Sequence, residues 1–375
     1  MKITDVRCTP VGVPRRKIFD RTVVTGLGPA AVSQYTLVEL MTDTDHVGLG
    51  EAACVFDPTG AALATYIESQ MRPKLLGRNP FDRSALNAML RSSAPTGYEP
   101  ALAAIDIALH DLMGKALDVP VYDLLGGMAR PRVPLSYSIP FGEPGEVVRF
   151  SRECLERGFK TLKIKIGQSH DRDVECVHRV CEAVPNDVIV RVDANMSFGD
   201  ATAALKFIDA IAGLHIELLE QPLAPDCLAE TTRIRERSPI PIMVDENVWG
   251  PATVVNVISA QAADVLNVYV MESGGLEAAR VNFSMAEAAG LKCMIGSMPE
   301  LGIGTAAQIH LGVAVPNLDL AADCCGSLYH DDDVTQPSLC LEDGFAVPPS
   351  GPGLGVELDW EKVDNFRLAA SGSAR

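Results

Sequence analysis

Long apolar segments are missing from this sequence of 375 residues. No apolar run reaches the ~18 residues that a membrane span needs, and the first ten residues, MKITDVRCTP, contain no hydrophobic signal core. These absences argue against a membrane protein and against an exported one. We therefore expect no membrane partner.

Clustered cysteines are also missing. The ten cysteines are scattered, with no CxxC pair and no spacing typical of a zinc site. Scattered cysteines of this kind are usually reduced, buried thiols in a cytosolic protein. We expect a cytoplasmic location and no structural zinc.

Positive charge is scarce. The sequence has 32 Lys and Arg against 49 Asp and Glu, which gives a formal net charge of -17. Such a surface repels the phosphates of nucleic acids and anionic membranes, so we expect no nucleic acid partner. An anionic substrate would need a local positive charge, which a lysine pair or a bound metal could supply.

No GxGxxG motif follows the first strand-like run, which argues against an open dinucleotide-binding sheet. Instead, short apolar runs recur about every 25 residues with helical patterns between them, as in residues 171–184, 200–213 and 274–290. Eight such units predict an α/β fold of the modified (β/α)8, TIM-like barrel type. The runs begin at residues 133, 161, 187, 215, 240, 263, 291 and 317.

The sequence before the barrel has a different pattern. Two antiparallel strands are expected near residues 1–14 and 35–53, and a long amphipathic helix near 100–117. We predict an α+β capping domain at 1–128, a catalytic barrel at 129–344, and a C-terminal segment, 345–375, that returns to the cap.

The stretch TLKIKIG at 161–167 places two lysines in an apolar strand. Side chains alternate along a strand, so Lys163 and Lys165 share one face. Taken alone, the pattern also fits an edge strand with one wet face.

The following strands all end in carboxylates. The third, fourth and fifth runs end in RVDAN, LLEQP and VDEN. In a barrel these strand ends meet at one rim, where converging carboxylates need a cation between them. Oxygen ligands favour Mg²⁺ or Mn²⁺ over zinc. A lysine next to such a cluster, with its pKa lowered by the other lysine, could act as a base near neutral pH.

The ordered motifs KxK, DAN, EQP and DE, with ALAAIDIALHDLMGK at 101–115 and LLGG at 124–127, resemble the enolase superfamily. The similarity is greatest to its muconate-lactonizing and mandelate-racemase-like branches and spans nearly the whole chain. It implies a Mg²⁺ ion (Mn²⁺ as the alternative) bound by Asp193, Glu220 and Asp245, with Glu246 as the other candidate for the third ligand.

The resemblance also implies the chemistry. Lys165 would remove the proton α to a substrate carboxylate, and the metal would stabilise the resulting enediolate; the pairing of a lysine base with Mg²⁺ in this superfamily is a known example. Lys163 would tune Lys165, and Asn195 would add a hydrogen bond to the substrate.

The sequence departs from the family pattern at two positions. The muconate-lactonizing branch has a second lysine on the sixth strand, where this sequence has Tyr269. The racemase branch has a histidine after the seventh strand, where this sequence has Ser297 and Met298. A phenol with a pKa near ~10 is a poor base and a usable acid, so only one strong base is expected.

One strong base favours a reaction on a single face of the substrate. We predict syn dehydration of a small hydroxy acid, such as a hydroxylated amino acid or a sugar acid. The alternatives are a cycloisomerase, a racemase or epimerase, and a barrel that binds a ligand without turnover.

The remaining predictions concern specificity. Glu300 and Asp323 are expected near the seventh and eighth strand ends, facing the substrate, and Ser297 beside them. Arg21 is a candidate for holding a second anionic group, and the loops at 18–26 and 54–60 are expected to line the site. The expected partner is a small-molecule carboxylate, and the chain is expected to form a homo-oligomer.

Overall fold

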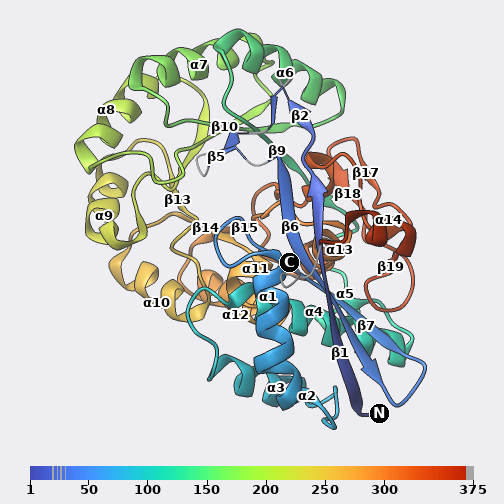
Figure 1. The fold of residues 1–375 in the computed structure, drawn as a ribbon. Coiled ribbons are helices and arrows are strands. Elements are labelled where there is room, and N and C mark those ends of the chain that lie inside the picture. Colours follow the sequence, from blue (N-terminus) through green and yellow to red (C-terminus); the bar gives the residue numbers. More distant parts are fainter. Residues whose placement is uncertain (19–20, 23, 26–27, 30, 369–375) are drawn as a thin grey trace, which may run out of the picture.

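A computed structural model describes residues 1–18, 21–22, 24–25, 28–29 and 31–368, with backbone alone at 21–22, 24–25 and 28–29 (Figure 1). Four very short strands occur early in the chain: β2 (Lys17–Ile18), β3 (Arg21–Thr22), β4 (Val24–Thr25) and β5 (Gly28–Pro29). No helix in the described part of the chain is long and apolar enough to cross a membrane.

The N-terminal part is a three-stranded antiparallel sheet covered by helices. The sheet has the order β1-β6-β7, formed by β1 (Ile3–Pro14), β6 (Val32–Thr42) and β7 (Val47–Ala53). In β1 buried residues recur between more exposed ones, as expected for a sheet with one packed face. The helical segments that follow are α1 (Gly60–Tyr66), η1 (Ile67–Met71), α2 (Arg72–Leu75) and α3 (Arg83–Arg91).

The long helix α4 (Glu99–Leu117) was expected to be amphipathic, and this prediction is wrong. Nearly every residue from Pro100 to Leu112 is buried, because β7 packs on one side of the helix and the barrel helices on the other. Gly50 permits this close packing: a Cβ there would lie 2.0 Å from the Ala104 carbonyl oxygen. Helix α4 therefore joins the cap to the barrel.

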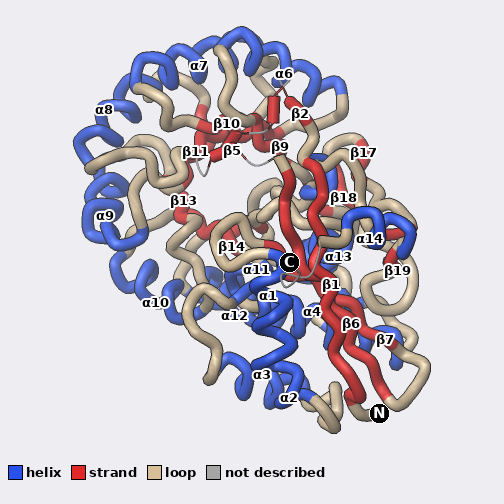
Figure 2. Tube along the Cα trace, in the orientation of Figure 1, coloured by secondary structure: helices blue, strands red, loops and turns tan. Residues whose placement is uncertain are grey.

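The barrel contains seven parallel strands in sequential order, surrounded by helices (Figure 2). The strands are β9 (Ser136–Ile139), β10 (Thr161–Lys165), β11 (Ile189–Asp193), β12 (Ile216–Glu220), β13 (Ile242–Val244), β14 (Val265–Val268) and β15 (Lys292–Ile295). The helices are α5 (Val121–Leu124), α6 (Pro144–Glu156), α7 (His170–Ala183), α8 (Ala201–Ile211), η2 (Pro225–Cys227), α9 (Leu228–Arg237), α10 (Pro251–Ala260), α11 (Val270–Ser273), α12 (Leu276–Ala288) and α13 (Gly302–Ala314).

The eighth position of the barrel is filled by residues 319–323, an extended segment with little regular strand. The Asp319 and Asp323 amides donate to carbonyls of β15, while the Ala322 amide donates to Pro134 next to β9. The segment closes the ring between the first and last strands. The chain is thus a modified TIM-like barrel with an N-terminal cap.

The C-terminal residues run along the outside of the barrel and reach the cap. They form η3 (Gly326–Tyr329), β16 (Thr335–Gln336), β17 (Leu341–Glu342), β18 (Phe345–Ala346), β19 (Glu357–Leu358) and α14 (Trp360–Phe366). Strand β18 pairs with β8 (Val133–Pro134). The Leu368 amide donates to the Pro10 carbonyl of β1, and the Val121 amide to the Gly353 carbonyl.

Candidate active site

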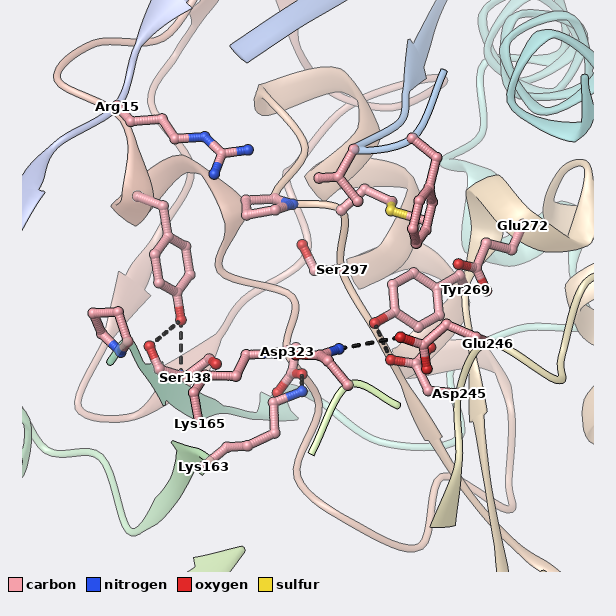
Figure 3. Close-up of a pocket in the computed structure, with 17 residues that line it drawn as sticks. Arg15, Ser138, Lys163, Lys165, Asp245, Glu246, Tyr269, Glu272, Ser297 and Asp323 are labelled. Atoms are coloured by element: carbon pink, nitrogen blue, oxygen red, sulfur yellow. Dashed lines mark hydrogen bonds and ion pairs between the residues drawn. The ribbon is translucent and has the colours of Figure 1, made fainter. Parts of the chain in front are cut away.

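A pocket opens at the carboxyl ends of the barrel strands, beneath the cap (Figure 3). Val55 and Phe56 of the loop after β7 line it, together with strand-end residues of the barrel, so the loop at 54–60 contributes to the site. The cavity has a volume of ≈ 90 Å³.

Both lysines of the KxK motif point into the barrel mouth. Strand β10 is paired with β9 on one side and β11 on the other, so the edge-strand alternative is wrong. Lys165 Nζ lies 2.5 Å from Asp193 Oδ2 and 2.6 Å from Asn195 Oδ1. The register explains this contact, because Lys165 and Asp193 are direct neighbours on adjacent strands.

Lys163 lies deeper, with 3% of its surface exposed. Its Nζ is 2.6 Å from Asp323 Oδ2 and 3.1 Å from Glu220 Oε2. Burial lowers its pKa, but the carboxylates of Asp323, Glu220 and Asp193 outweigh burial and raise the pKa well above its ordinary value. The predicted lowering of the Lys163 pKa by the neighbouring lysine is therefore wrong.

The three predicted metal ligands lie at the ends of three adjacent strands around this mouth. Asp193 and Glu220 end β11 and β12 and are fully buried, and Asp245 follows β13. Burial and the Glu246 and Glu220 carboxylates raise the pKa of Asp245 well above its usual range. In Asp193, burial is outweighed by Lys165 and Lys163, which lower the pKa.

Two tight turns fix these carboxylates. Asn195 and Gln221, each just after a strand-end carboxylate, have left-handed φ values of 38° and 34°. The Gln221 side chain accepts a hydrogen bond from the Asp245 amide (2.7 Å) and donates to the Leu223 carbonyl (2.7 Å) and to Asn247 Oδ1 (2.8 Å). The turn after β12 thus supports the carboxylate that follows β13.

Glu246 also reaches the pocket. Neighbouring residues on a strand were expected to point in opposite directions, yet Asp245 and Glu246 both line the cavity. The expectation is wrong because β13 ends at Val244, so strand alternation no longer applies. Glu246 Oε1 accepts a hydrogen bond from Asn195 Nδ2 at 3.2 Å. Burial and Asp193 raise the pKa of Glu246 to about 7.

The donor set fits a divalent cation. All candidate ligands are carboxylate oxygens, the type that Mg²⁺ and Mn²⁺ prefer. Asp245 Oδ1 and Glu246 Oε2 are buried without a hydrogen-bond partner among the described residues. Among the described residues, no three His, Cys, Asp or Glu side chains lie close enough to form a metal-binding group. The lysine ammonium groups contact the carboxylates instead.

Tyr269 stands at the end of β14, four strands from β10 and therefore across the barrel mouth from Lys165 (Figure 3). Its hydroxyl donates to Asp245 Oδ2 at 3.1 Å. Burial, together with the Asp245 and Glu220 carboxylates, raises the pKa of Tyr269 well above 10. The phenol is therefore neutral, and the tyrosinate form that could act as a base is populated even less than in an exposed tyrosine.

Ser297 lines the pocket, but Glu300 does not. The Glu300 carboxylate turns back onto its own loop, where Oε2 accepts hydrogen bonds from Ser297 Oγ (2.5 Å) and the Met298 amide (3.0 Å). Its geometry supports positioning of Ser297 rather than direct contact with a substrate.

Asp323 lines the pocket, where it contacts Lys163 and accepts a hydrogen bond from the Ser136 hydroxyl. Arg21 lies outside the residues whose side chains the structure describes. The described residues instead place Arg15, just after β1, over the pocket (Figure 3).

Three residues of the site carried no signal in the sequence analysis. Arg15 and Glu272 reach the pocket only through the tertiary fold. Asn267 donates to Glu220 Oε1 at 2.8 Å, and its position on β14, two residues before Tyr269, would have been the only available signal. Burial and the Glu246 and Glu300 carboxylates raise the pKa of Glu272 well above its usual range.

The site can be compared with known proteins. Residues 146–363 match the family described as Enolase C-terminal domain-like, and residues 9–126 match the Mandelate racemase / muconate lactonizing enzyme, N-terminal domain. The chain is 30% identical to a chloromuconate cycloisomerase of Delftia acidovorans over 99% of this chain and 100% of that protein. It is 28% identical to an N-succinyl-L-Arg/Lys racemase of Bacillus cereus over 98% of each.

A solved structure agrees closely. The muconate lactonizing enzyme of Pseudomonas fluorescens, complexed with muconolactone, superposes with a TM-score of 0.94 at 28% identity, covering 98% of this chain and 99% of that one. The chain therefore belongs to the enolase superfamily, in its mandelate racemase and muconate-lactonizing branch.

Proposed function

We propose that this enzyme dehydrates a small β-hydroxy carboxylate by syn elimination. The observation that carries the proposal is the asymmetry of the pocket: a lysine stands on one wall, and a phenol with a raised pKa stands on the other. Only Lys165 can then move a proton at the carbon α to the carboxylate.

The residues at the mouth have separate tasks. Asp193, Glu220 and Asp245 would hold the divalent ion that this family generally uses, here Mg²⁺ or Mn²⁺. When bound, the ion supplies positive charge for the substrate carboxylate oxygens as negative charge develops. Lys163 lies against Asp323 and Glu220, and these carboxylates raise its pKa. Asn195 orients Lys165 through their 2.6 Å contact.

Elimination can be completed on one face. Lys165 accepts the α-proton and, as an ammonium, returns a proton to the departing β-hydroxyl, which leaves as water. Tyr269 cannot efficiently remove an α-proton from the opposite face, because the tyrosinate that would accept this proton is scarcely populated when the pKa of the phenol lies far above neutral pH. This reasoning disfavours racemisation.

A second candidate is isomerisation. The relatives are a cycloisomerase, a racemase and, at 32% identity over 95% of this chain, an L-Ala-D/L-Glu epimerase of Clostridium acetobutylicum. These names favour an isomerase over a lyase. Cycloisomerisation also needs one proton transfer on one face, so it is compatible with the same pocket.

Proton NMR in D₂O separates the two. The enzyme, with Mg²⁺, is incubated with acid sugars, hydroxyprolines and other hydroxylated amino acids. We expect water loss, and recovered substrate that contains deuterium at the α-carbon but keeps its configuration. Inversion at a rate near that of turnover would instead identify a racemase, and ring closure without water loss would identify a cycloisomerase.

Tyr269→Phe is the matched variant for this experiment. If the phenol only donates a hydrogen bond, its removal should slow exchange by about fivefold, the value of one net hydrogen bond. Loss of inversion in this variant, were inversion present in the parent, would assign the second base to Tyr269.

A further inference from the structure

Two carboxylates on one wall of the pocket have no role in the proposed proton transfer when Asp193, Glu220 and Asp245 hold the metal. Glu272 is 1% exposed and Glu246 is 9% exposed, and both line the cavity. The Oε2 atom of each is buried without a hydrogen-bond partner among the described residues. Figure 3 shows both carboxylates on the side of Tyr269, across the pocket from the lysines.

Local structure holds Glu272 in this place. Helix α11 begins directly after Tyr269 and is a single turn, closed by a hydrogen bond from the Ser273 amide to the Tyr269 carbonyl (3.1 Å). Glu272 therefore follows Tyr269 by three residues and lies on the same side of the turn. The orientation comes from the backbone and not from an ion pair.

The described cations around the pocket are engaged elsewhere. Lys163 contacts Asp323, and Lys165 contacts Asp193. Arg15 donates through Nε to Ser33 Oγ at 2.5 Å. Arg91, close behind α11, directs its Nη atoms to the Ser273 and Gly274 carbonyls.

A divalent ion and the two lysines would together supply four positive charges. Four other carboxylates at the mouth already match them: Asp193, Glu220, Asp245 and Asp323. Glu272 and Glu246 would therefore stay uncompensated. A second carboxylate on the substrate would be repelled from this wall. A positively charged group there would donate charge-assisted hydrogen bonds to both free oxygens. It would also favour the ionised form of Glu272, whose pKa burial and the neighbouring carboxylates otherwise raise.

We propose that Glu272, with Glu246 beside it, binds the cationic nitrogen of the substrate, so that the substrate is a small β-hydroxy amino acid. The identity of the reaction rests on the proposed function, whereas recognition of the ammonium group does not. Dehydration of such a substrate removes the α-hydrogen and the β-hydroxyl together as one water. The product retains the nitrogen on a carbon–carbon double bond, as an enamine.

Binding is tested with ligands that cannot be dehydrated. L-Valine is compared with (S)-2-hydroxy-3-methylbutanoate, and L-proline with (S)-tetrahydrofuran-2-carboxylate. Each pair has the same skeleton, with nitrogen replaced by oxygen, and none has a β-hydroxyl. Dissociation constants are measured by calorimetry on the Mg²⁺-loaded enzyme. We expect the ammonium member of at least one pair to bind about tenfold more tightly.

The variant Glu272→Gln should remove this preference, by weakening the ammonium member about tenfold and leaving its neutral partner unchanged. Glu272→Asp, which keeps the charge, should restore part of it. Glu287→Gln is the control variant. It removes a negative charge from the exposed face of α12, away from the pocket, and should change neither dissociation constant.

Three results would overturn the inference: equal binding within both pairs, a preference that survives in Glu272→Gln, or loss of bound Mg²⁺ from that variant, which would make Glu272 a metal ligand. Ammonium selectivity without water loss from any hydroxylated amino acid would support the binding site and contradict the proposed dehydration. Water loss without ammonium selectivity would support the proposed dehydration and contradict the ammonium site at Glu272.

Discussion

Buried charges in the barrel are neutralised to different extents at two depths. Below the mouth, Arg191 is fully buried on β11, and its Nε donates to Glu217 Oε2 at 2.5 Å while Nη1 donates to the Ala321 carbonyl at 2.8 Å. Two residues along the same strand lies Asp193, whose surroundings include Asp245 and Glu246, each with an unpartnered oxygen. Arg191 Nη2 also lacks a hydrogen-bond partner among the described residues, but the charge of Arg191 is paired with one carboxylate, whereas the mouth holds more carboxylates than ammonium groups.

This difference indicates what each level is for. Arg191 Nη1 contacts the Met294 sulfur, and Met294 belongs to an apolar cluster. The other members of this cluster are Leu218, Met243, Val265 and Leu320, so Arg191 borders a closed core. The mouth carries an excess of carboxylates that costs stability in the absence of a cation. We expect changes at the mouth to alter activity, and changes at the lower level to alter stability.

Removal of divalent metal should have the largest effect. EDTA should abolish α-proton exchange, because the charge that develops on the substrate carboxylate would then lack its main stabilisation. Mg²⁺ or Mn²⁺ should restore it, as followed by NMR in D₂O. Full exchange in metal-stripped enzyme would contradict the assignment of Asp193, Glu220 and Asp245.

Lys165→Ala should come next, with α-proton exchange slower by about 10²–10⁴-fold, the usual contribution of a general base. The free energy of unfolding in urea should change little in the Mg²⁺-loaded protein. Lys163→Ala serves as the comparison and should weaken exchange without removing it. Equal exchange rates in Lys165→Ala and the parent would show that another residue is the base.

Glu217→Gln should have the opposite effect to Lys165→Ala, with lower stability and unchanged activity. It leaves the Arg191 guanidinium without its carboxylate, and because the Glu217 side chain is 30% exposed, the cost should be about 1–2 kcal/mol of unfolding free energy. Exchange and turnover should match those of the parent. A stable but inactive variant would remove the distinction between the two levels.

A smaller effect is expected at the junction of cap and barrel. Glu51 is fully buried in β7, where it accepts hydrogen bonds from the Leu301 and Gly304 amides at 2.8 and 2.9 Å. Burial raises its pKa from 4.5 to about 8, against the effect of these amides. The folded state therefore holds this proton more tightly than the unfolded state, and the resulting stabilisation is lost as pH rises from 4.5 to 8.

Urea unfolding of the Mg²⁺-loaded protein between pH 5 and pH 8.5 tests this directly. The parent should lose stability across that window, and Glu51→Gln should show a flatter profile. An unchanged slope in the variant would assign the pH dependence to other groups.

Local patterns predicted much of the site. Strand alternation placed both lysines on one face, and the order of the strand ends brought Asp193, Glu220 and Asp245 to one rim. Features that depend on distant contacts were not predictable. The raised pKa of Lys163 depends on Asp323, 160 residues away, and Glu272 meets Glu246 only because two adjacent strands deliver their following turns to one wall.

Loop conformation limited the rest. Glu300 was predicted to lie near the seventh strand end and to face the substrate. Its carboxylate instead turns back toward Ser297, because the loop before α13 offers two hydrogen-bond donors there. The burial of α4 depends on Gly48 and Gly50 in β7, which leave room for the backbone of the helix. This role cannot be seen until β7 is packed against α4.

The left-handed turn at Gln221 has a consequence for how this site can vary. Glutamine has no intrinsic advantage at a positive φ, and glycine would relieve the strain there. A glycine would, however, delete the side chain that holds the Asp245 amide and Asn247 together. Substitutions at 221 and 247 should therefore be tolerated only in combination. New substrate specificities are more accessible through positions such as 272 and 297, because among the described residues neither side chain links the turns of two different strands.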